Sequence, residues 1–285
     1  MDAEQTGYAR YRQVVSQLMC GDEQLPSLPV ITLEIRRSLR SPEVSLGTLS
    51  GLISKDPALS ALLMKYAASA MLRSSRPPKT LQDVLQVLGL AQVDRVTMIH
   101  SIKSLFTLHS PGHKKLFIEA WERLILKAST CAFLARLVGY TQPDHAFLAS
   151  LLSELGSLAV LSAFRDDPVA PSRELYYRLC RDYSKSLGVI LLKKWAVDEE
   201  FIGIIRNTGN WLHRERYHLE LIDLVNLSLY HSVKGMNAEA DLPELSSLAA
   251  YAKLLPPLNV IGDNDELALL ISHRAEIHAL ADALR

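Results

Sequence analysis

Apolar residues recur at intervals of three and four along most of the chain, without a sustained alternation of apolar and polar positions. This spacing places apolar side chains on one face of an α-helix, whereas a half-buried strand requires a period of two. The pattern therefore predicts an all-α protein. Caps, prolines and glycines predict helices over residues 8–20, 30–40, 46–54, 81–88, 91–108, 113–138, 146–164, 173–183, 187–195, 199–207, 215–233, 243–254 and 265–284. A further helix is predicted to begin at Pro57, capped by Asp56, and to continue at least to Ala70.

Residues 146–164 are apolar or small on every face of the predicted helix, and Glu154 is their single charge. The stretch is almost long enough to span a bilayer, but a central carboxylate costs at least about 2.5 kcal/mol there, and four serines dilute the run. We therefore expect a buried core helix. A buried carboxylate must be paired or protonated, so the partner of Glu154 is the central question.

Composition excludes several classes of function. The 285 residues contain 31 basic and 31 acidic side chains, so no net charge attracts nucleic acid or an anionic membrane. Cys20, Cys131 and Cys180 are widely spaced and lack a CxxC motif, which favours reduced, buried thiols. No signal peptide is visible at the N-terminus. These features predict a cytoplasmic protein.

Motifs for catalysis are also absent from the sequence. It has no glycine-rich phosphate loop, no GxSxG and no HExxH. His213 and His218 are five residues apart, as are His273 and His278. Five residues turn a helix by about 500°, so neither pair points in one direction. We expect neither a metal nor a cofactor.

Several short motifs nevertheless occur in a recognisable order. They are LPSLP at 25–29, SKDPAL at 54–59, AASA at 67–70, KTL at 79–81, VLGL at 87–90, Trp121, AFLASLL at 146–152, Gly156, Gly188, LL at 191–192 and Trp195. This order resembles the HDOD family over roughly residues 22–230. The resemblance implies a helical bundle in two lobes. We expect an N-terminal helix over 1–21 and an HDOD-like domain over 22–235. Within that domain, the first lobe ends near 108 and a degenerate HD-type lobe begins near 113. A C-terminal helical extension then covers 236–285.

The family resembles the HD phosphohydrolases, which hold a divalent metal with a His, a His-Asp pair and a later Asp. The matching positions of this sequence carry Arg123, then Ser153 and Glu154, and then approximately Leu229. One carboxylate beside a cation cannot hold a catalytic metal, so the resemblance implies an inactive site. These four residues are the candidates for a degenerate site or ligand pocket. We expect Arg123 to pair with Glu154; alternatively, Arg123 extends into solvent and serines or backbone groups meet Glu154.

The resemblance implies a non-enzymatic bacterial signal-transduction module that acts through protein–protein interaction. Its expected partner is a signalling protein such as a sensor kinase, a response regulator or a cyclic-di-nucleotide enzyme; nucleic acid and membrane are not expected. The alternative is a sensor that keeps the phosphohydrolase pocket for a nucleotide or other small ligand. Arg123 and Ser153 could bind phosphate there, although Glu154 would repel it. A hydrolase with an unrecognised site is a third possibility. The oligomeric state is left open.

Overall fold

The computed structural model describes residues 12, 13, 15, 16, 19, 25–68, 78–107, 110–140, 142–165, 167–213, 217–236 and 242–284. Within these residues the regular elements are α-helices and short 3-10 helices, with one isolated β-bridge between Ile261 and Leu267. The predicted all-α class is confirmed. The predicted helix over residues 1–21 lies almost wholly outside the described residues.

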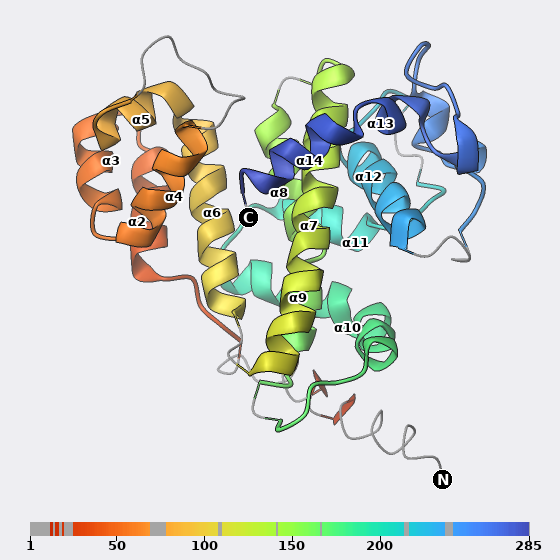
Figure 1. Cartoon of the computed structure of the whole chain (residues 1–285), viewed down its shortest axis with the longest axis horizontal. Helices are drawn as coiled ribbons and strands as arrows, with labels where there is room; N and C mark the ends of the chain where they lie inside the picture. Colours follow the sequence, from red (N-terminus) through yellow and green to blue (C-terminus); the bar gives the residue numbers. More distant parts are fainter. Residues whose placement is uncertain are drawn as a thin grey trace. The chain divides into compact units, whose positions relative to one another are not determined.

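The chain divides into two compact units (Figure 1). One comprises Ser27–Leu105 and His278–Arg285, and the other comprises Met1–Pro26 and Phe106–Ile277. The domain bounds expected near residues 21, 108, 113 and 235 remain a prediction.

The smaller unit is built from helices whose starts are encoded locally. Ser45 accepts a hydrogen bond from the Thr48 backbone N–H, and Asp56 accepts one from Leu59. Thr80 and Asp83 form a reciprocal capping box. Each cap satisfies backbone donors that have no partner within the helix. The helices are α2 (Val30–Leu39), α3 (Leu46–Ile53), α4 (Pro57–Ala67), α5 (Leu81–Leu88) and α6 (Leu90–Phe106).

The larger unit is organised around a long central helix, α7 (Pro111–Leu137), which contacts α8, α9 and α12. The helices that follow it are α8 (Pro143–Ser153), α9 (Leu155–Ser162), α10 (Arg173–Lys194), α11 (Glu199–Asn207) and α12 (Leu221–Met236). The elements that follow are η2 (Leu245–Ser247), η3 (Tyr251–Lys253), η4 (Asp263–Asp265), α13 (Ala268–Ser272) and α14 (Arg274–Asp282), and the residues of α14 from His278 onward are assigned to the smaller unit. Of the described residues, Pro143–Ser162 form the one stretch apolar and long enough to span a membrane, but 83% of its most apolar window is buried inside the protein. It is therefore weak evidence for a membrane span.

Five predicted helices differ from the structure in their continuity or type. The expected helix over 146–164 is broken at Glu154, and the two expected over 173–183 and 187–195 are one continuous helix. The segment expected to be helical over 243–254 contains only two 3-10 turns, and the last predicted helix is broken at His273. In the 243–254 segment, Asp265 accepts the Leu245 N–H and the Trp211 carbonyl accepts the Ala249 N–H. These backbone N–H groups, which would bond within the segment if it were an α-helix, instead bond to residues far away in the sequence. The spacing of apolar residues cannot reveal such long-range hydrogen bonds.

Candidate functional site

The apolar stretch at the centre of the larger unit changes direction at Glu154, between α8 and α9. Glu154 has φ −119° and ψ 15°, outside the helical region. Its carbonyl accepts hydrogen bonds from both the backbone N–H (2.9 Å) and the hydroxyl (2.7 Å) of Ser157. The carboxylate is therefore at the start of α9, where the helix dipole favours negative charge.

Gly156 lets the first turn of α9 lie directly against the backbone of α10. A Cβ atom at this position would lie 1.8 Å from the Ser184 carbonyl oxygen and 2.8 Å from the Gly188 nitrogen. The Tyr176 hydroxyl also crosses from α10 to α9, where it donates to the Ser157 carbonyl at 3.1 Å. These contacts hold the helix break at a defined position against α10.

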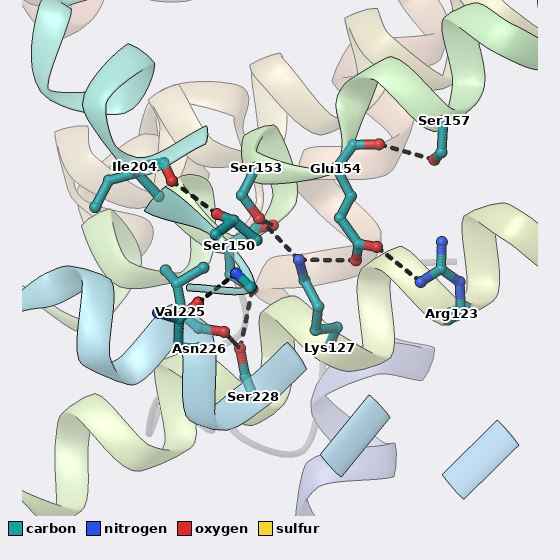
Figure 2. A network of polar contacts seen from close by, with 12 residues as sticks. Arg123, Lys127, Ser150, Ser153, Glu154, Ser157, Ile204, Val225, Asn226 and Ser228 are labelled. Carbon is teal, nitrogen blue, oxygen red and sulfur yellow. Dashed lines mark hydrogen bonds and ion pairs between the residues drawn. The ribbon is translucent and has the colours of Figure 1, made fainter. Parts of the chain in front are cut away.

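Two cations of α7 meet the Glu154 carboxylate from different sides (Figure 2). Arg123 Nη1 donates to Glu154 Oε1 at 2.9 Å, and Lys127 Nζ lies 2.8 Å from Oε2. Lys127 Nζ also donates to Ser153 Oγ at 2.8 Å, and that hydroxyl donates in turn to the Ser150 carbonyl at 2.8 Å. The Lys127 side chain is fully buried, whereas those of Arg123 and Glu154 are 13% and 18% exposed. Arg123, Lys127, Ser153 and Glu154 are called the ion cluster below.

The charges of the cluster determine its protonation. Burial opposes ionisation of Glu154, but Arg123 and Lys127 outweigh it and lower the pKa of Glu154 to about 2. Burial likewise opposes the charge of Arg123, but Glu154 raises the pKa of Arg123 above its ordinary value. For Lys127 burial prevails, and the pKa is lowered although Glu154 opposes the change. Glu154 is thus ionised at neutral pH.

The structure brings three of the four candidate residues together and separates the fourth. Arg123, Ser153 and Glu154 belong to the ion cluster, whereas Leu229 lies on another face of α12, with Cδ2 beside Gly209. The neighbouring α12 residue Ser228 instead joins the polar network, with its hydroxyl 3.3 Å from Ser150 Oγ. A helix turns by about 100° per residue, so a one-residue difference in alignment moves a side chain to another face.

Lys127 is the residue of the cluster that the sequence reasoning missed. It follows Arg123 by four residues on α7, a spacing that places two side chains on the same helix face. This spacing was an available signal. It is a weak one, because most lysines on amphipathic helices extend into solvent.

Neutral groups surround the cations. Cys131 is close to Lys127, and Cys180 is close to Arg123. Burial raises the pKa of each of these two thiols to about 12. Burial raises the pKa of Tyr176 well above its ordinary value. Both cysteines are free thiols, and Cys20 lies outside the described residues. Glu154 is accordingly the one anion that the cluster contains.

The ion cluster does not fit a divalent metal. Ammonium and guanidinium groups offer hydrogens rather than lone pairs, and both oxygens of Glu154 already face them. The described residues contain no group of three or more His, Cys, Asp or Glu side chains that could hold a metal ion. The chemistry available here is ion pairing and hydrogen-bond donation.

The sequence and the fold of this chain are similar to those of several known proteins. An uncharacterized protein of Treponema pallidum (strain Nichols) is 24% identical over 218 residues, which are 71% of this chain; the chain spans only 41% of that protein's length. A solved structure of a proposed metal-dependent phosphohydrolase from Shewanella amazonensis SB2B has a TM-score of 0.73 at 19% identity, with 97% of this chain and all of that chain covered. An HDOD domain protein of unknown function from Geobacter sulfurreducens has a TM-score of 0.67 at 19% identity, with 96% and 97% covered.

A proposed signal-transduction protein from Marinobacter aquaeolei VT8 has a TM-score of 0.63 at 18% identity, with 97% of this chain and 66% of that chain covered. At such identities these structures establish the shared fold alone. The family model of the HDOD domain matches residues 25–210. This match covers well over half of the sequence, and the chain belongs to the HDOD domain family.

Proposed function

We propose that the protein is a non-enzymatic, cytoplasmic signal-transduction module of bacteria that acts through protein–protein interaction. The observation that carries the proposal is the ion cluster. Lys127 Nζ lies 2.8 Å from both Ser153 Oγ and Glu154 Oε2, the side chains at the two positions that match the His-Asp pair of HD enzymes. An ammonium group of the protein itself thus lies between the two positions from which a metal would be held.

Electrostatics opposes a metal at this place. Two unit charges about 4 Å apart interact by roughly 4 kcal/mol at an effective dielectric constant of 20. A divalent ion at that distance from the Lys127 ammonium would be repelled by about twice as much, and Arg123 would add to the repulsion. Glu154 alone supplies negative charge, and it is shared between two cations. The hydrolytic chemistry of HD enzymes therefore has no support in these residues.

The interaction part of the proposal rests on the family and on the fold. The Marinobacter aquaeolei protein with this fold is a proposed signal-transduction protein. A module without its own chemistry acts by binding, so we expect a partner such as a sensor kinase, a response regulator or a cyclic-di-nucleotide enzyme. We expect the protein to act between a signal and an effector rather than in metabolism.

An assay for hydrolysis of bis(p-nitrophenyl) phosphate, with and without Mn²⁺, tests whether the protein is catalytic. Elemental analysis of the purified protein tests whether it holds a metal. We expect no stoichiometric metal and no turnover that a chelator abolishes. Turnover that is chelator-sensitive and is lost in Glu154→Gln would overturn the non-enzymatic assignment.

A two-hybrid screen against the sensor kinases, response regulators and cyclic-di-nucleotide enzymes of the source organism tests the interaction. We expect a specific binary pair that purified proteins reproduce. A Gly156→Leu variant, which cannot keep the contact between α9 and α10, is the folding-dependent control and should lose the pair. A complete screen without any such pair would contradict the interaction part.

A further inference from the structure

With Lys127 protonated in its 2.8 Å ion pair with Glu154, the ion cluster contains one more positive than negative charge. Arg123 and Lys127 are its two cations and Glu154 is its anion, while neighbouring Tyr176 and Cys180 are neutral because burial raises the pKa of both. An uncompensated charge in a largely buried place is costly, so a counter-ion is favoured there. Glu154 is already paired through both oxygens, and this reduces the repulsion that it would exert on a second anion.

Arg123 offers the hydrogen bonds that such an anion would need. Only Nη1 of the guanidinium is used by Glu154. Nε is buried and has no hydrogen-bond partner among the described residues. Nε and Nη2 carry parallel N–H groups along the edge of the guanidinium that does not hold Glu154. That edge matches two oxygens of a phosphate or carboxylate group.

The Arg123 side of the ion cluster is partly open to solvent. The Arg123 side chain is 13% exposed and that of Glu154 is 18% exposed, in contrast to the fully buried Lys127. In Figure 2, Lys127 and Arg123 lie on opposite sides of the carboxylate, so Lys127 cannot compete for the free edge of Arg123. The Tyr176 hydroxyl of α10 donates its hydrogen to the Ser157 carbonyl at 3.1 Å.

We propose that the Nε/Nη2 edge of Arg123 is a binding site for a small oxyanion, a phosphate group, which balances the charge of the ion cluster. The site goes beyond the proposed signalling function and requires no catalysis. A buried N–H left without a partner costs about 1–3 kcal/mol, so a phosphate group that satisfies Nε is favoured by hydrogen bonding as well as by charge. Two sources share this chemistry: free inorganic phosphate, and the phosphate of a small metabolite such as a nucleotide.

Thermal unfolding of the full chain with increasing sodium phosphate, at ionic strength held constant with sodium chloride, tests the site. We expect a saturable rise in Tm of about 2–3 °C in the wild type. Isothermal titration with phosphate should give the same dissociation constant. Adenosine 5′-monophosphate in the same assay identifies the source: tighter binding than inorganic phosphate indicates a nucleotide, and equal binding indicates the free ion.

Three variants make the test specific. Arg123→Met leaves Lys127 and Glu154 as a balanced pair, and it should fold and lose the phosphate effect. Arg123→Lys keeps the charge without the two-pronged edge and should bind phosphate at least 10-fold more weakly. Arg173→Met, which removes an exposed arginine of α10 that is paired with Glu119, is the matched control and should respond as the wild type does.

An equal Tm rise in chloride alone, or an unchanged phosphate effect in Arg123→Met, would overturn the proposal. Either result leaves the signalling function standing, because turnover and partner binding test that function separately.

Discussion

Glu154→Gln removes the negative charge of the ion cluster while it keeps the shape of the side chain. Arg123 and Lys127 would then face each other in a largely buried place without a counter-charge. The lowering of the Glu154 pKa from 4.5 to about 2 corresponds to about 3 kcal/mol of favourable interaction with the ionised form. Removal of one partner from a buried ion pair typically costs about 3–5 kcal/mol. We therefore expect Glu154→Gln to lose about 3–5 kcal/mol of unfolding free energy at pH 7.

Lys127→Met is the matched comparison, because it leaves Arg123 and Glu154 as a balanced pair. Its cost comes from two buried groups that lose Lys127: Glu154 Oε2 loses its ion-pair partner and Ser153 Oγ loses a hydrogen-bond donor. A buried polar group left without its partner typically costs about 1–3 kcal/mol. The substitution also removes the unfavourable burial of an ammonium group, which offsets part of that cost. Charge balance thus predicts that Glu154→Gln is clearly the more damaging of the two, although Lys127 is the more deeply buried residue.

Urea unfolding followed by far-ultraviolet circular dichroism measures both variants. The pH dependence provides a second readout. The folded-state pKa of Glu154 is depressed, so its contribution is present above pH 4.5 and is lost as the pH falls towards 2. The stability difference between wild type and Glu154→Gln should therefore shrink across this acid window. A difference below about 1 kcal/mol at pH 7, or a larger loss in Lys127→Met, would refute the reasoning.

Three further predictions concern the rest of the larger unit. Gly156→Ala should lose several kcal/mol of stability or fail to fold, because its Cβ would overlap the backbone of α10. Gly203→Ala in α11 is the control: its Cβ would meet nothing within 4 Å, so it should be neutral or stabilising. Thermal unfolding measures both variants. Cys131, whose thiol is buried with its pKa raised to about 12, should react with a thiol reagent at neutral pH at least 100-fold more slowly in the native protein than in urea. Lys253→Met should cost about 3–5 kcal/mol, because it leaves the Asp223 carboxylate, 2% exposed, without the ammonium at 2.8 Å; calorimetry measures the loss.

Each of these predictions has an outcome that would contradict it. Equal stability of the two glycine variants would show that α9 and α10 do not approach as closely as the structure has them. Rapid labelling of the native thiol would mean that α7 opens readily. A loss below about 0.5 kcal/mol in the Lys253 variant would make the Asp223 pair equivalent to an exposed surface pair.

Local features were predictable from the sequence because their causes lie within a few residues. The caps at Ser45, Asp56 and Thr80 each act on a backbone N–H three residues ahead, so the start of a helix can be read from one short segment. The helix break at Glu154 has no such local cause. Apolar residues continue on both sides of it, and the close approach of Gly156 to α10 supports the new direction of the chain.

The candidate site was partly predictable. Arg123, Ser153 and Glu154 were identifiable through the resemblance. Leu229 was not, because the neighbouring Ser228 rather than Leu229 contacts Ser150 in the polar network. Lys127 carried no family signal, and its burial became apparent only in the packed structure.

By itself, the amino-acid sequence determined the helical class, the local caps, the family and the isolation of one carboxylate in an apolar stretch. Periodicity, capping and composition are properties of neighbouring residues, and they persist in any arrangement of the helices. Only the tertiary structure decided that Arg123 and Lys127 both meet Glu154, that the helix breaks there, and that Arg123 Nε is buried without a hydrogen-bond partner among the described residues. These features depend on distances between segments about 30 residues apart, and side-chain packing rather than local propensity sets those distances.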